Sequence, residues 1–153
     1  MPYLVFSQSS LTSLEAGRLG QHAKRFFGAE FELRERPEGG EAGELVMALS
    51  GVKGAPGAVF HARVRPATAA DYEAAERAER AGAAGGMALL ARRCAFVWEL
   101  DLGEKGEVEL LRLCAILASV LLGPVMPPEG DTLFGVRGAR ERAERLERSC
   151  IVR

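Results

Sequence analysis

The sequence has few of the residues from which active sites and metal centres are most often built. Its 153 residues include two histidines, three cysteines and one tryptophan. The cysteines, Cys94, Cys114 and Cys150, are widely spaced and form no CxxC pair, so no zinc or thioredoxin-like motif is present. We therefore expect neither a metal nor another cofactor. An odd number of cysteines without a disulfide framework fits a reducing compartment.

The chain also lacks long apolar segments and a strong charge of either sign. Its apolar run from Leu113 to Leu122 is shorter than the roughly 20 residues needed to cross a bilayer. The N-terminal residues have neither the basic region nor the apolar core of a signal peptide. The formal net charge of −1 gives no overall attraction to nucleic acid or to an anionic membrane. We expect a cytoplasmic protein with no membrane partner, and the charge argues against a nucleic-acid partner.

What is present predicts one globular domain, residues 1–153, organised around the stretch from Glu107 to Gly123. The chain is 48% hydrophobic and 27% charged, as ordinary soluble domains are. From Leu113 to Leu122 every residue except Ser119 is apolar, and a helix that is apolar all round is buried on all sides. We predict that this stretch is the central helix of the core. Gly123 is expected to end it in the left-handed conformation.

The other patterns predict an α+β fold with a mixed or antiparallel sheet of about five strands packed against helices. Alternation or continuous apolar runs place strands at residues 3–6, 30–34, 45–49, 59–65 and 95–102. Capping boxes at Thr12–Glu15 and Thr68–Asp71 start two helices, and the last helix runs from Val136 to about Cys150. The predicted order is β-α-β-β-β-α-β-α-α. The glycine-rich segment Ala81–Gly86 lacks a phosphate-loop motif, so we interpret it as a helix break.

One candidate site combines two carboxylates on a strand face with polar residues of the neighbouring strand. Its members are Glu99, Asp101, His61, Arg63 and the loop Pro127–Phe134. Paired carboxylates serve acid–base or metal chemistry when their surroundings perturb them. The simpler interpretation is a solvated sheet face, or a salt bridge from Glu99 to Arg63 or Arg65. A cysteine–histidine nucleophile is disfavoured because Cys114 lies in the apolar helix and Cys94 has no surrounding motif.

The second candidate site is the last helix, which is rich in arginine and glutamate. Ala139, Ala143, Leu146 and Cys150 form a narrow stripe at helical spacing. The preferred interpretation is that this stripe docks on the chain's own domain. The alternative is a helix that contacts a partner or a second copy of the chain, and its candidate contact residues are Arg140, Arg145, Arg148 and Leu146. The acidic stretch from Glu30 to Glu44 has the opposite charge bias, which suits steering of such contacts.

No catalytic set emerges from these residues. The sequence therefore favours a non-enzymatic protein-interaction domain, such as an adaptor, a chaperone-like protein or an immunity-type protein, that binds another protein or itself. The alternative is a small enzyme or ligand-binding domain with its site near Glu99, Asp101 and the loop Pro127–Phe134. A deep pocket with convergent polar groups would favour the alternative, and a flat charged surface would favour the interaction domain.

Overall fold

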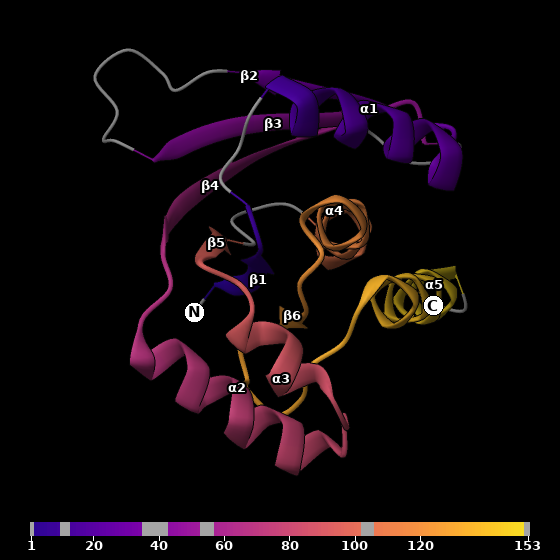
Figure 1. The fold of residues 1–153 in the computed structure, drawn as a ribbon. Coiled ribbons are helices and arrows are strands. Elements are labelled where there is room, and N and C mark those ends of the chain that lie inside the picture. The colour runs from indigo at the N-terminus through magenta and orange to yellow at the C-terminus, as the bar shows by residue number, and fades with distance from the viewer. Residues whose placement is uncertain (1, 10–12, 35–42, 53–56, 102–105, 152–153) are drawn as a thin grey trace.

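The computed structural model describes residues 2–9, 13–34, 43–52, 57–101 and 106–151. The order of elements is β1 (Tyr3–Ser7), α1 (Ser13–Phe27), β2 (Glu30–Arg34), β3 (Glu44–Ser50), β4 (Ala58–Pro66), α2 (Ala69–Gly82), α3 (Met87–Arg92), β5 (Phe96–Leu100), α4 (Glu107–Leu121), β6 (Val125–Met126) and α5 (Val136–Ile151). These elements confirm the predicted α+β class (Figure 1).

The described strands form one antiparallel sheet in the order β2-β3-β4-β5-β1-β6. β1 lies between two other strands, as its apolar sequence predicts. The sixth strand, β6, is not among the predicted strands, and it pairs only Leu4 with Met126 and Val5 with Val125. Two residues are too few to show the alternation that identifies a strand from sequence.

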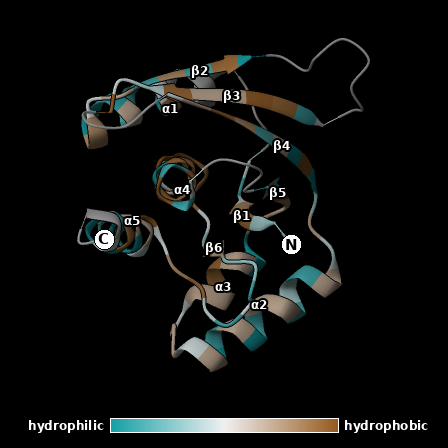
Figure 2. Ribbon diagram, turned by 180° about the vertical axis from the view of Figure 1, so that it is seen from behind, coloured by the Kyte–Doolittle hydropathy of each residue, from teal (hydrophilic) through white to brown (hydrophobic). Residues whose placement is uncertain are grey.

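The helix α4 lies at the centre of the molecule, as its apolar sequence predicts (Figures 1 and 2). Leu113, Ile116 and Leu117 have no accessible surface. One face of the sheet packs on α4 together with α1 and α5, and we call it the inner face. At about 1.5–3 kcal/mol for each large apolar side chain, burial of α4 is the main stabilising contribution of this layer.

The end of α4 differs from the prediction, because Leu122 rather than Gly123 adopts the left-handed conformation. Leu122 has φ 58°, and its N–H donates to the carbonyl oxygen of Ala118 at 3.1 Å. Gly123 is needed for another reason. A Cβ atom at this position would lie 1.9 Å from the carbonyl oxygen of Phe6 on β1. The glycine therefore lets the chain leaving α4 pass against the backbone of β1.

The second helical unit, α2 and α3, packs on the opposite side of the sheet, at the β5-β1-β6 end. Small residues of these helices bury Phe6, Val97 and Met126. The Thr68–Asp71 capping box is confirmed. Helix α2 ends at Gly82 and α3 begins at Met87, so the glycine-rich segment interrupts the helix as predicted. Thr12 lies outside the described residues, so the first capping box stays a prediction.

Helix coverage therefore divides the sheet into two halves. The β5-β1-β6 half has helices on both faces. In the β2-β3-β4 half, α1 and α4 cover the inner face. Figure 1 shows α1 in front of β2 and β3, and the reverse view in Figure 2 shows it behind them. No described helix contributes to a buried cluster on the other side of these three strands. That surface is called the outer face below.

Candidate functional site

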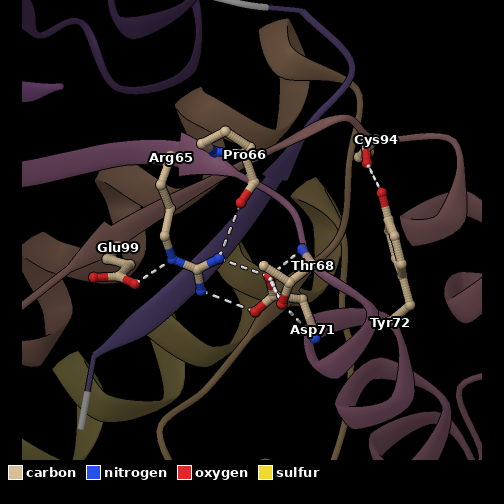
Figure 3. Close-up of polar contacts among 7 residues, drawn as sticks. All are labelled: Arg65, Pro66, Thr68, Asp71, Tyr72, Cys94 and Glu99. Atoms are coloured by element: carbon tan, nitrogen blue, oxygen red, sulfur yellow. Dashed lines mark hydrogen bonds and ion pairs between the residues drawn. The ribbon is translucent and has the colours of Figure 1, made fainter.

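The most highly connected polar group is the guanidinium of Arg65, at the end of β4 (Figure 3). Its Nε donates to Glu99 Oε1 at 2.5 Å, and its two terminal nitrogens donate to the two oxygens of Asp71 at 2.6 and 2.8 Å. Asp71 also accepts from the Thr68 backbone N–H at 2.7 Å and from the Thr68 hydroxyl at 3.0 Å. This Arg65 cluster connects β4, β5 and the first turn of α2.

The electrostatics of the Arg65 cluster suit a structural contact better than acid–base chemistry. The hydrogen bonds from Arg65 lower the pKa of Asp71, and those from Thr68 lower it further, which outweighs the effect of burial. A general acid or base needs a pKa near the working pH, whereas this carboxylate is held in its charged form. The bidentate geometry is typical of a strong arginine–carboxylate pair. The predicted salt bridge from Glu99 to Arg65 is confirmed.

The structure only partly assembles the alternative site predicted from sequence. Glu99 lies opposite both Leu4 of β1 and Arg63 of β4, and Leu4 in turn lies opposite Met126. The loop Pro127–Phe134 therefore begins on the same side of the sheet as Glu99, with Leu4 between them. The side chain of Glu99 is already bonded to Arg65, while Asp101 and His61 are exposed.

The cavities near this loop are open and contain few polar side chains. One cavity of about 560 Å³ lies between the α2–α3 connection and residues 132–138. Its one charged lining residue, Arg137, is 93% exposed and pairs with Glu141 at 3.1 Å. A second cavity, of about 290 Å³, lies where Ala74 and Arg77 of α2 face Leu4 and the start of the loop. The charged residues that line the second cavity, Arg77 and Glu129, are both exposed to solvent, so neither cavity is a buried polar site.

The apolar stripe of the terminal helix α5 packs against the core of the same chain. Ala139 and Ala143 are buried in the core that contains α4, and Leu146 is half-buried against it. Arg112 of α4, itself buried, bonds to Glu147 at 3.0 Å. These contacts support the preferred interpretation, in which the stripe docks on the chain's own domain.

The arginines of α5 differ in their surroundings. Arg140 lies over the rings of Phe26 and Phe27 of α1, at 5.2 and 5.7 Å from their centroids. Arg145 and Arg148 are exposed. These two therefore stay candidate contact residues, and a contact by Arg140 would have to compete with its stacking on α1.

The outer face of β2, β3 and β4 is a mixed surface that sequence analysis treated only as separate strand faces. Its residues are Glu30, Glu32, Arg34, Glu44, Val46, Ala48, Ser50, Val59, His61 and Arg63. The strand register aligns Glu32, Ala48 and Val59 in one row across the sheet. The next row contains Arg34, Val46 and His61.

A shallow cavity of about 270 Å³ lies at one end of this face. Its lining includes Ala48 and Val59, with Glu30 and Glu32 beside them. Ala48 and Val59 are half-buried, while Glu30, Glu32, His61 and Arg63 are exposed. The face therefore has a small apolar centre with Glu30 and Glu32 at one end. At the other end Arg34, His61 and Arg63 lie near Glu44, which is opposite Arg63, and Val46 between them is buried.

Sequence analysis missed a contact between α1 and α4. Nδ1 of His22 lies 2.7 Å from the hydroxyl oxygen of Ser119, which donates to the carbonyl oxygen of Ile116 at 2.7 Å. Because the single hydroxyl hydrogen is used there, His22 is the donor to Ser119. Burial, with the charges of Arg18 and Arg25, lowers the pKa of His22. The arrangement joins two helices and leaves Ser119 without the base that a nucleophile requires.

The remaining reactive groups are shielded. Cys94 and Cys114 are buried and unpaired with each other, and burial raises the pKa of the Cys94 thiol to about 11. Within the described residues, no group of three or more metal-binding side chains comes together. No helix in the described part of the chain combines the length and apolar character that crossing a membrane requires.

The sequence matches no protein-family model, and comparison with curated proteins and with solved structures also gives no match.

Proposed function

We propose that this chain is a non-enzymatic protein-interaction domain and that it contacts its partner with the outer face of β2, β3 and β4. One observation carries the proposal: among the described helices, those that cover this half of the sheet all lie on its inner side. The uncovered side has an apolar centre at Ala48 and Val59 within a charged rim. Protein interfaces commonly combine an apolar centre with a polar, solvent-accessible rim.

The distribution of charge on the face suggests the chemistry of the partner. Glu30 and Glu32 flank the apolar centre on β2, while His61 and Arg63 follow it along β4. A complementary protein surface would present a lysine or arginine to the glutamates and a hydrogen-bond acceptor to the exposed His61. Such complementarity guides association and fixes the orientation of the partner.

The Arg65 cluster supports this proposal over the enzyme alternative. It directs Glu99 and Asp71 to an arginine of the same chain, so neither carboxylate is available to a substrate unless that arginine moves. A rigid connection at the end of β4 also fixes the strand that supplies Val59, His61 and Arg63. Preorganised surfaces bind with a smaller entropic cost.

The test begins with affinity capture from the source cell and mass spectrometry, and continues with calorimetry on the purified partner. Val59→Glu should weaken binding by about tenfold or more, because it places a charge in the apolar centre. The control is the double variant Arg145→Glu, Arg148→Glu, which changes the exposed cations of α5. If the control abolishes binding while Val59→Glu preserves it, the contact lies on α5 and the outer-face proposal is wrong. Loss of a catalytic activity in Glu99→Gln, with association unaffected, would instead favour the enzyme.

A further inference from the structure

The two edges of the sheet differ in whether they are covered. At the β6 edge, Val125 exchanges backbone hydrogen bonds with Phe134 at 2.7 and 3.0 Å, so the chain's own next segment occupies that edge. At the other edge, β2 pairs with β3 and has no further described strand beside it. Backbone N–H and C=O groups on the free side of an edge strand are a template for pairing with another strand.

β2 is regular over its whole length. Its register with β3 runs without interruption from Glu30, opposite Ser50, to Arg34, opposite Val46. It therefore contains no bulge, and its sequence contains no proline, so two common devices that block an edge are absent. Charged side chains, which also protect edge strands, are present at Glu30, Glu32 and Arg34. The order of these charges determines which strand can pair with the edge.

The sequence of β2, Glu-Phe-Glu-Leu-Arg, is complementary to itself when two copies run antiparallel. If the two-fold axis passes through Glu32, Arg34 lies opposite Glu30 of the second copy. If the axis passes through Leu33, Arg34 lies opposite Glu32 of the second copy. Both arrangements produce two glutamate–arginine pairs on the outer face, and opposite charges across strands are favourable. The axis through Glu32 also places Glu32 opposite Glu32 of the second copy, whereas the axis through Leu33 places leucine opposite leucine, so the second register is the more favourable one. An axis through Phe31 would instead put glutamate opposite glutamate.

We infer that the β2 edge joins two copies of this chain into a two-fold symmetric dimer with a sheet continuous across both. The interface is isologous, so it closes after two subunits instead of extending into a filament. On the inner face, the half-buried Phe31 and Leu33 would come next to their counterparts and lose further apolar surface to water. This inference does not depend on the outer face having a separate partner.

A five-residue strand makes a small contact, so the dimer should be weak. Interfaces at the low end of the size range are typical of transient complexes. We therefore expect a monomer–dimer equilibrium that depends on protein concentration. Sedimentation equilibrium of the full chain, from about 1 μM to about 1 mM, covers the relevant range of dissociation constants.

Charge reversal tests both the surface and the register. Arg34→Glu should raise the dissociation constant by about tenfold or more, because it converts two attractive pairs into repulsive ones. Adding Glu30→Arg to that variant should restore the dimer if the axis passes through Glu32. Adding Glu32→Arg should restore it if the axis passes through Leu33. Arg80→Glu is the control, because it makes the same charge change on an exposed residue of α2, away from β2.

The inference is overturned if the unmodified chain stays monomeric over the whole range, if Arg34→Glu dimerises as well as the unmodified chain, or if neither double variant recovers. A thermal melt of each variant checks that its fold is intact. Hydrogen exchange gives a second measurement, and because it uses the unmodified chain it does not depend on whether a variant folds. The backbone amides of residues 30–34 should exchange more slowly at high protein concentration, and equal rates at both concentrations would argue against edge pairing.

Discussion

Replacing Asp71 with asparagine should destabilise the protein by about 2 kcal/mol, because a hydrogen bond that includes a charged group contributes about 1.5–3 kcal/mol. Asparagine keeps the size of the side chain and one acceptor oxygen for Thr68, but it loses the charge-assisted bidentate contact with Arg65. The Asp71 side chain is only 9% exposed and that of Arg65 is 27% exposed, so solvent screens the pair incompletely. For a chain of this size the melting temperature should fall by about 4–8 °C.

The same variant should show a defined pH dependence. Hydrogen bonding to Arg65 lowers the pKa of Asp71 in the folded protein. The carboxylate therefore contributes its full stabilisation above its unfolded pKa of about 3.9 and loses it as the pH falls through the lower folded value. The difference in unfolding free energy between the unmodified chain and Asp71→Asn should be constant above about pH 5 and shrink in more acidic solution.

Urea unfolding followed by circular dichroism, at several pH values, measures this difference. Glu76→Gln is the control, because it removes a carboxylate of α2 whose pair with Arg92 is solvent-exposed, and it should leave the unfolding curve unchanged. Equal stability of Asp71→Asn and the unmodified chain at pH 7 would refute the structural role of the Arg65 cluster. A stability difference that persists undiminished well below pH 3 would refute the electrostatic explanation.

Three further predictions concern the core. Leu117→Asp should abolish folding, since an unpaired buried carboxylate costs several kcal/mol against a typical total of 5–15, and a soluble variant with an unchanged melting curve would contradict the burial of α4. Gly123→Ala should lower the melting temperature sharply, because its Cβ would clash with the Phe6 carbonyl; an unchanged melt would show that this close approach is not required. A chelator with a reductant should leave the melting temperature unchanged, given that Cys94 and Cys114 are free thiols, and a large drop would reveal a metal or a disulfide.

Patterns that depend on local sequence predicted the fold well. The apolar character of α4 identifies the centre of the core because no other position can bury a helix on all sides. The Thr68–Asp71 box identifies the start of α2 because both partners lie within one helical turn. Contacts that depend on tertiary structure were not predictable in the same way. The two residues of β6 are defined by pairing with β1, and Gly123 is explained by the distant carbonyl of Phe6.

The candidate sites show the same limit. Sequence analysis identified Glu99 as a charged strand residue and considered Arg65 as its partner, but Asp71 joins them only because the α2 cap folds back on the end of β4. It also treated Arg140 as a surface cation, whereas the stacking on Phe26 depends on how α1 crosses the layer next to α5. The outer face could not be identified, since the pattern of one strand does not reveal whether a helix from elsewhere covers it.

The proposed partner contact and the proposed dimer together make a prediction about stoichiometry. In a dimer joined through β2, the charged side chains of both edge strands lie on the same side of the continuous sheet, so the two outer faces adjoin. Each copy retains its own apolar centre at Ala48 and Val59, and the complex should therefore contain two chains and two partners. Arg34→Glu should reduce it to one of each, while Val59→Glu should leave the dimer intact and remove the partner. Sedimentation equilibrium at protein concentrations above the dissociation constant of the dimer gives the masses directly. One partner bound to an intact dimer would mean that the partner spans the two-fold axis, and the contact would then have to include the β2 edge itself.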